Sequence, residues 1–66
     1  MNIIVNGESR RIATEATVAG LLEEFGLPPR KIAIERNREI VPKSAYGTTA
    51  LRDGDEIEIV QFVGGG

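Results

Sequence analysis

Apolar and polar residues alternate at the start of the chain, which is the pattern of a β-strand with one buried face. Ile3 and Val5 stand two residues apart, and Asn6-Gly7 follows them directly. The dipeptide Asn-Gly favours the positive φ angles of a type I′ hairpin turn. A second strand is therefore predicted to return over residues 9–12, so that the chain opens with a β-hairpin.

The apolar spacing then changes to that of an amphipathic helix, at positions i, i+3, i+4 and i+7: Val18, Leu21, Leu22 and Phe25. Thr17 is placed to cap the first turn, because a threonine hydroxyl can accept a hydrogen bond from a free helical N–H. Gly26 can adopt the left-handed conformation that ends a helix, and Pro28-Pro29 prevents its continuation.

The second half of the chain returns to short strands. Residues 31–35 read as a strand, 36–38 as a tight turn, and 39–41 as a short returning strand that Pro42 stops. Residues 43–50 have weak periodicity, which predicts an irregular or 3₁₀ segment, with Leu51 pointing inward. Residues 52–55 have the composition of a turn. The last strand is predicted over residues 56–62, where Ile57 and Ile59 face one way and Glu58 the other.

The predicted order is thus β-β-α-β-β-(short turn)-β, an α+β chain whose single helix can cover only one face of the sheet. This order favours a single-domain β-grasp, with a mixed sheet of about five strands and the first and last strands parallel at its centre. The predicted core consists of the apolar residues on the inward positions: Ile3, Val5, Ile12, Val18, Leu21, Leu22, Phe25, Ile32, Ile34, Ile40, Leu51, Ile57 and Ile59.

Composition narrows the chemistry that this chain can perform. Its 66 residues include no cysteine and no histidine, which excludes disulfides, thiolate metal sites, cysteine nucleophiles and imidazole bases. The formal net charge is −2, with both signs mixed along the chain, so nucleic acid is not an expected partner. No long apolar run or leader is present, and we expect a cytoplasmic protein, away from membranes and monomeric when free, that binds no metal or cofactor.

The chain stops on Val63-Gly64-Gly65-Gly66, directly after the last predicted strand. Consecutive glycines lack Cβ atoms and can pass through a channel too narrow for side chains. Extended, the four residues after Phe62 reach about 13 Å, which is enough to carry the Gly66 carboxylate into another protein's active site. We therefore expect a domain over residues 1–62 and a flexible tail over 63–66. The alternative is a frayed terminus without function.

Two other features invite a functional interpretation. Val60 and Phe62 are predicted to point away from Ile57 and Ile59, onto the uncovered face of the sheet, where they could dock a partner; alternatively, Phe62 folds over the sheet edge into the core. Asp53 and Asp55 form a carboxylate pair, but turn chemistry explains them better, because there is no pocket-forming bulk around them. The basic turn of Arg36 and Arg38 is most simply a solvated turn.

Several of these segments together resemble the ThiS family, the sulfur carrier proteins of thiamine biosynthesis, which are ubiquitin-like β-grasp proteins. The resemblance runs nearly end to end. It is carried by Thr17-Val18 with Leu21-Leu22, by the stretch of residues 34–43, by Leu51 with Asp53-Gly54-Asp55, and by residues 57–60 running into the glycine tail. The chain departs from the family in having Tyr46 where tryptophan is frequent, and in a third glycine, Gly64, before the expected pair.

The resemblance implies a protein cosubstrate rather than an enzyme. A ubiquitin-activating-like adenylyltransferase would use ATP to adenylate the Gly66 carboxylate, a sulfur donor protein would convert it to a thiocarboxylate, and thiazole synthase would take the sulfur. Gly64, Gly65 and Val63 would enter the partner's active site. A carboxylate is a poor electrophile at neutral pH, since its pKa is near 3.5, so activation by a partner is chemically required.

Other functions remain open at this point. The small subunit of molybdopterin synthase shares the fold and the tail, although that family is typically longer. A ubiquitin-like modifier that conjugates to lysine uses the same acyl adenylate. A β-grasp binding module with an inert tail belongs to a different class, and it should tolerate extension of the chain beyond Gly66, whereas a carrier should not.

Overall fold

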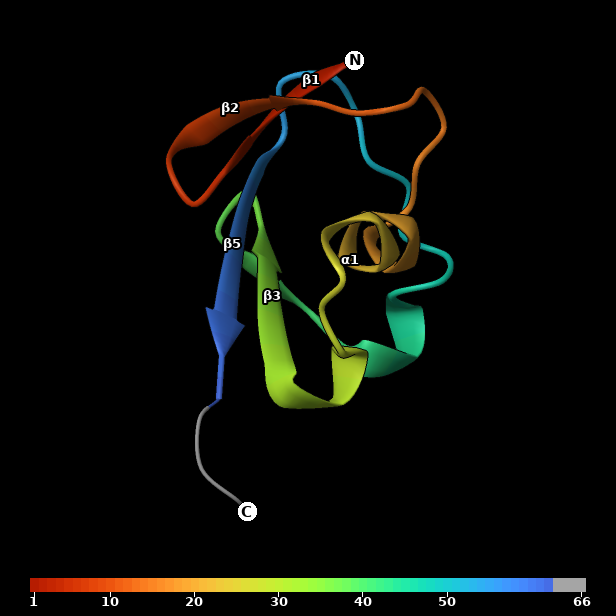
Figure 1. The fold of residues 1–66 in the computed structure, drawn as a ribbon, viewed down its shortest axis with the longest axis vertical. Helices are drawn as coiled ribbons and strands as arrows, with labels where there is room; N and C mark the ends of the chain where they lie inside the picture. The colour runs from red at the N-terminus through yellow and green to blue at the C-terminus, as the bar shows by residue number, and fades with distance from the viewer. Residues whose placement is uncertain (63–66) are drawn as a thin grey trace.

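The computed structural model describes residues 1–62, which form a five-stranded sheet and a single α-helix packed against it (Figure 1). The elements follow one another in the order β1 (Asn2–Val5), β2 (Glu8–Arg11), α1 (Val18–Phe25), η1 (Pro29–Lys31), β3 (Ile32–Arg36), β4 (Glu39–Val41), η2 (Lys43–Ala45) and β5 (Glu56–Gln61), where η denotes a 3₁₀-helix.

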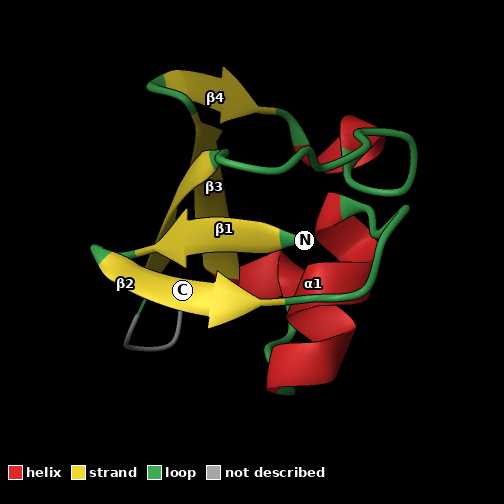
Figure 2. Cartoon of the chain, turned by 90° about the horizontal axis from the view of Figure 1, so that it is seen from above, coloured by secondary structure: helices red, strands yellow, loops and turns green. Residues whose placement is uncertain are grey.

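The strand order is β2-β1-β5-β3-β4, which places β5 at the centre of the sheet. β1 and β5 are parallel, and every other pairing is antiparallel. Seen from above, the sheet and α1 form two layers (Figure 2). This is the β-grasp arrangement that the order of elements predicts, with the first and last strands side by side.

Both helix signals in the sequence are confirmed. Thr17 has extended backbone angles, and its hydroxyl accepts a hydrogen bond from the Gly20 N–H at 3.1 Å. Gly26 adopts the left-handed conformation with φ of 69°, and its N–H donates to carbonyls of the last helical turn. A side chain at position 26 would be strained at this φ, so the helix ends where glycine permits the turn.

The hydrophobic core lies between α1 and the sheet. Most of the predicted members are buried, while Phe25 and Ile59 are only partly buried and pack against the edge of the core. The prediction that Ile40 belongs to the core is wrong, because its side chain is 76% exposed. The two-residue turn at Asn37 and Arg38 pairs Ile34 with Val41 across the hairpin, so that Val41 faces inward and Ile40 outward.

Tyr46 belongs to the hydrophobic core, although it lies in the irregular part of the chain. It follows η2, is almost fully buried, and its hydroxyl donates a hydrogen bond to the Ile32 carbonyl at 3.4 Å. Burial raises the pKa of the Tyr46 hydroxyl, which therefore stays protonated in the core. Other differences concern element bounds: β2 begins at Glu8, and a 3₁₀ turn occupies the residues before Ile32.

Candidate functional site

The strand that leads to the glycine tail, β5, is hydrogen-bonded to its neighbours along most of its length. On one side, β1 pairs with only its first half, at Ile4 with Glu56 and Val5 with Ile57. The Asn6 side chain then continues the ladder: its Oδ1 accepts from the Ile59 N–H at 2.7 Å, and its Nδ2 donates to the Ile59 carbonyl at 3.2 Å. The amide thus takes the place of one more strand residue.

The other hairpin turn holds the beginning of β5. The Asn37 N–H donates to the Glu56 carbonyl at 2.8 Å, and its Oδ1 accepts from the Glu56 N–H at 2.9 Å. Both turn asparagines have positive φ, 50° at Asn6 and 51° at Asn37. Asparagine tolerates this conformation better than most residues. The same two residues therefore shape the hairpins and fix β5 at two points.

Asp55 anchors this end of the sheet from the turn before β5. It is only 6% exposed, and its Oδ2 accepts from Arg36 Nε at 2.9 Å and from the Arg52 N–H at 2.8 Å. Its Oδ1 accepts from Asn37 Nδ2 at 3.0 Å. The turn interpretation of Asp53 and Asp55 holds, but Arg36 is not merely solvated, because it forms a partly buried ion pair.

The protonation of Asp55 follows from this environment. Burial is the largest single influence and raises the pKa of the carboxyl, but the hydrogen bonds from Arg36, Arg52 and Asn37, with the charge of Arg36, outweigh it together. The pKa of Asp55 is therefore lower than its ordinary value, and the group is ionised at neutral pH. Asp55 has a structural role, since hydrogen bonds within the domain already engage both of its carboxylate oxygens.

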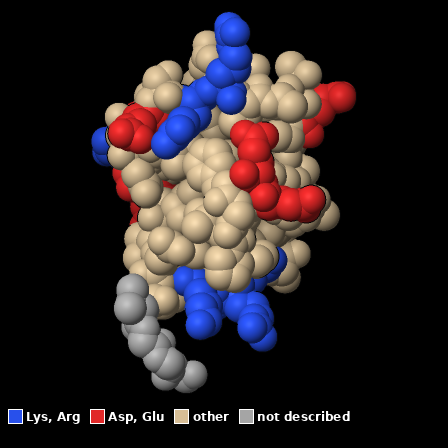
Figure 3. Space-filling view, viewed as in Figure 1, with Lys and Arg blue, Asp and Glu red and all other residues tan. Residues whose placement is uncertain are grey.

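Phe62, the last described residue before the tail, lies near a group of Lys and Arg residues. The Phe62 N–H donates to the Lys31 carbonyl at 2.8 Å, which continues the pairing of β5 with β3 by one residue. Lys43 Nζ donates to the Arg30 carbonyl at 2.7 Å and so joins η2 to η1. Lys and Arg side chains gather at this lower end of the molecule (Figure 3). Positive charge therefore stands close to the point where residues 63–66 begin.

The sheet face opposite α1, which we call the open face, carries exposed apolar side chains. No described element covers it (Figure 1). Val60 is 54% exposed and Phe62 57% exposed, so the predicted exposure of both residues is confirmed and the alternative of a buried Phe62 is wrong. Ile4 and Ile40 are exposed on the same face, since each lies opposite an outward-facing glutamate in the sheet register. These four are the exposed large apolar residues of residues 1–62.

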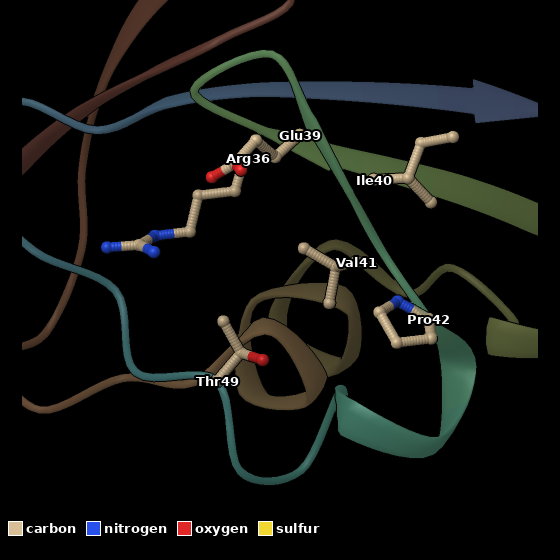
Figure 4. A pocket seen from close by; sticks show the side chains of 6 residues that line it. All are labelled: Arg36, Glu39, Ile40, Val41, Pro42 and Thr49. Carbon is tan, nitrogen blue, oxygen red and sulfur yellow. The ribbon is translucent and has the colours of Figure 1, made fainter.

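A small pocket lies at the β4 edge, lined by Arg36, Glu39, Ile40, Val41, Pro42 and Thr49 (Figure 4). Val41 points toward the helix side and Ile40 to the opposite side of β4. The Arg36 guanidinium is already engaged by Asp55. Thr49 is the one hydroxyl-bearing residue among those lining the pocket, and the chain has no histidine to activate it, so this pocket does not suggest nucleophilic catalysis.

The predicted tail residues, Val63, Gly64, Gly65 and Gly66, lie outside the described residues. Within residues 1–62, no three His, Cys, Asp or Glu side chains stand close enough to hold a metal ion. The search for membrane-spanning helices over the same residues finds none of sufficient length and apolarity. The structure therefore brings together a firmly held β5, an apolar open face and the start of the tail.

Comparison with known sequences identifies the family. The sequence model of the ThiS family matches residues 3–66, nearly the whole chain including the four tail residues. The chain belongs to the ThiS family. This confirms the family that the sequence motifs indicate.

Relatives of this ThiS family member differ in length. A protein named thiazole synthase from Paramagnetospirillum magneticum is 53% identical over all 66 residues of the chain, which span only 20% of that protein. Sulfur carrier protein ThiS from Bacillus subtilis is 46% identical over 50 residues, 76% of each chain. The crystal structure of a thiamine biosynthesis protein (ThiS) from Geobacter metallireducens superposes with a TM-score of 0.86 at 32% identity, covering both chains completely.

Sequence reasoning missed the residues that position β5. The Asn6-Gly7 pair signals a turn, but nothing in the sequence shows that the Asn6 amide also pairs with Ile59. The Arg36 and Asp55 pair is separated by 19 residues, and its two members look like ordinary turn residues. The turn at Asn37 is a signal that could have found the outward position of Ile40, because the turn sets the register of the hairpin.

Proposed function

We propose that this chain is a sulfur carrier of thiamine biosynthesis, which acts as a protein cosubstrate through the carboxylate of Gly66. The observation that carries the proposal is the family match, which extends through the whole glycine tail. The name of the Bacillus subtilis relative, a sulfur carrier protein, supports it. The chain's lack of cysteine and histidine accords with chemistry performed by partners rather than by its own side chains.

The reaction would proceed in three balanced steps. A carboxylate oxygen of Gly66 attacks the α-phosphorus of ATP and releases pyrophosphate, which leaves an acyl adenylate. The terminal sulfur of a donor protein's persulfide then displaces AMP and leaves an acyl disulfide, and a thiol attacks the donor's sulfur, forming a disulfide with it and releasing the Gly66 thiocarboxylate. Free hydrosulfide would displace AMP and give the thiocarboxylate directly. The thiocarboxylate sulfur finally bonds to an electrophilic carbon of the acceptor, and water cleaves the acyl–sulfur bond, which leaves the sulfur on the acceptor and returns the Gly66 carboxylate. Adenylation is needed because the carboxylate anion has no good leaving group.

The described residues suit the delivery of such a tail. β5 sits between β1 and β3 and is fixed by Asn6 and Asn37, so that the tail starts from a defined position. Val60 and Phe62 lie just before it on the open face, and they would anchor the ubiquitin-activating-like adenylyltransferase. Glycines at 64, 65 and 66 would let the tail enter a narrow active site.

The acceptor would be thiazole synthase. The relative from Paramagnetospirillum magneticum that carries this name contains a segment matching our entire chain. A carrier-like segment in one polypeptide with that name supports an association between carrier and synthase. We place the protein in the cytoplasm with its ATP-using partner, and we propose that the carrier itself holds no cofactor.

The deciding experiment is the intact mass of the chain after incubation with ATP, a sulfide source and the adenylyltransferase of the thiamine pathway. We expect a gain equal to exchange of one oxygen for sulfur, located at Gly66 by fragmentation. A chain extended by one residue beyond Gly66 is the matched control and should gain nothing. An unchanged mass, with an authentic carrier converted in parallel, would reject the proposal in favour of an inert tail.

The docking role of Phe62 has its own test. Phe62→Ala should raise the KM for the carrier in adenylation by about tenfold, equivalent to about 1.4 kcal/mol of lost binding, since the ring is exposed in the free protein and buried only against the partner. The stability measured by urea should change by less than about 0.5 kcal/mol. An unaltered KM would remove Phe62 from the docking surface.

A further inference from the structure

Three glutamates run across the middle of the open face in a pattern that folding does not favour. Glu35 on β3 lies directly opposite Glu58 on β5, and Glu56 precedes Glu58 by two residues on the same side of β5. We call these three residues the acidic strip. Like charges placed directly opposite in neighbouring strands repel each other. Repulsion between these carboxylates therefore lowers the stability of the folded domain.

The acidic strip lacks partners within the domain. Over residues 1–62 the ion pairs are Arg10 with Glu8 and Arg36 with Asp55, and neither includes a strip residue. Arg38 lines the same shallow hollow as the strip and Val60 but forms no ion pair with it. The three carboxylates spread along two strands rather than converging on a point, and they do not form a group that could hold a metal ion.

Apolar side chains frame the strip on the same face. Ile40 lies opposite Glu35 in the register, and Ile4 lies opposite Glu56. Val60 follows Glu58 on β5, and the alternation continues to Phe62 at the root of the tail. A surface with exposed apolar groups around unpaired charges fits a protein partner of opposite charge.

From this arrangement we infer that the open face is an electrostatically steered docking surface, on which the acidic strip pairs with a basic, partly apolar surface of the enzyme that adenylates the tail. The inference rests on the proposed function and deepens it. That enzyme must hold ATP and a carboxylate together, so it needs positive charge around its active site. β5 carries Glu56, Glu58 and Val60 on the open face and runs directly toward Phe62 and the tail, so a partner that holds the tail can lie along this face.

Other occupants fit the face less well. A second copy related by a twofold axis would bring acidic strip against acidic strip. Nucleic acid would be repelled for the same reason. A basic protein surface satisfies the three carboxylates and the apolar frame at once.

The test compares two double variants that change the net charge equally. Glu35→Gln with Glu58→Gln neutralises the strip, whereas Glu23→Gln with Glu24→Gln neutralises two exposed glutamates on α1, on the other side of the molecule. Each carrier is titrated into the adenylyltransferase with ATP, and pyrophosphate exchange gives kcat and KM. Both series are run at about 20 mM and about 500 mM salt, because charge steering is screened at high ionic strength.

We expect the strip variant to raise KM about tenfold at low salt and less than about twofold at high salt, with kcat unchanged. The α1 variant should stay within about twofold of the wild type at both salt concentrations. Unfolding in urea should show the strip variant at least as stable as the wild type, since a repulsive pair is removed.

The two proposals fail in different ways. If the strip variant has the same KM as the wild type, or if the α1 variant raises KM as much as the strip variant does, the docking inference is wrong. Either result leaves the carrier function intact. An effect that persists undiminished at high salt overturns the electrostatic argument as well. A wild-type chain that supports no exchange with an active enzyme overturns both proposals.

Discussion

Replacing Asp55 by Asn removes the buried charge at the start of β5 while keeping the shape of the side chain. The carboxylate accepts three hydrogen bonds, one of them from the guanidinium of Arg36. A hydrogen bond to a charged group contributes about 1.5 to 3 kcal/mol. The Arg36 side chain is 29% exposed, so water compensates part of this loss. We expect Asp55→Asn to lower the free energy of unfolding by about 2 kcal/mol at pH 7.

The stability that Asp55 contributes depends on pH. The pKa of Asp55 is lowered in the folded protein, so the stability due to its ionisation is fully present above the unfolded pKa of about 3.9 and is lost as the pH falls through the folded pKa below it. Urea unfolding followed by circular dichroism at pH 7, 4 and 2.5 measures this. The difference between wild type and Asp55→Asn should be constant from pH 7 to about 5 and should shrink below about 4.

Asp53→Asn is the matched control, since Asp53 lies in the same turn and accepts a hydrogen bond only from the exposed Asn2 N–H among residues 1–62. It should cost less than about 0.5 kcal/mol. The reasoning is refuted if Asp55→Asn costs no more than Asp53→Asn at pH 7. It is equally refuted if the difference from wild type stays the same down to pH 2.5.

Three further predictions concern stability in urea. Leu22→Ala should cost about 2 to 5 kcal/mol, because the side chain is fully buried between α1 and the sheet, and a loss under about 1 kcal/mol would contradict that placement. Thr17→Ala should cost about 0.5 to 2 kcal/mol by removing the cap on the Gly20 N–H, with Thr17→Ser restoring most of it. Ile40→Thr should change stability by less than about 1 kcal/mol, whereas Val41→Thr at the next position should cost more, and equal effects would argue against the observed register.

The regular elements were predictable because each has a strong local signal. The helical spacing from Val18 to Phe25, the cap at Thr17 and the glycine at 26 identify α1 from neighbouring residues alone. The strand β4 has only three residues, of which two are apolar, so alternation cannot decide which one is inward. The register from β3 decides it, and a shift of one residue reverses every side chain.

The parts of the site that depend on distant contacts were less accessible. The exposure of Val60 and Phe62 followed from strand alternation and the single helix. Burial of Tyr46 could not be read from its segment, because irregular chain has no period to set a face. The ion pair of Arg36 with Asp55 joins two turns, and turn composition describes the backbone without showing which charges meet.

The central position of β5 has a mechanical consequence. A force applied along the axis of β5 would run parallel to the ladders that this strand forms with β1 and β3. Such a load acts on the hydrogen bonds of both ladders, and on the Asn6 amide, simultaneously instead of opening them singly. A strand at the sheet edge would peel away under the same force. The central position of β5 thus spreads a load along its axis over two ladders, whereas an edge strand would be held by one.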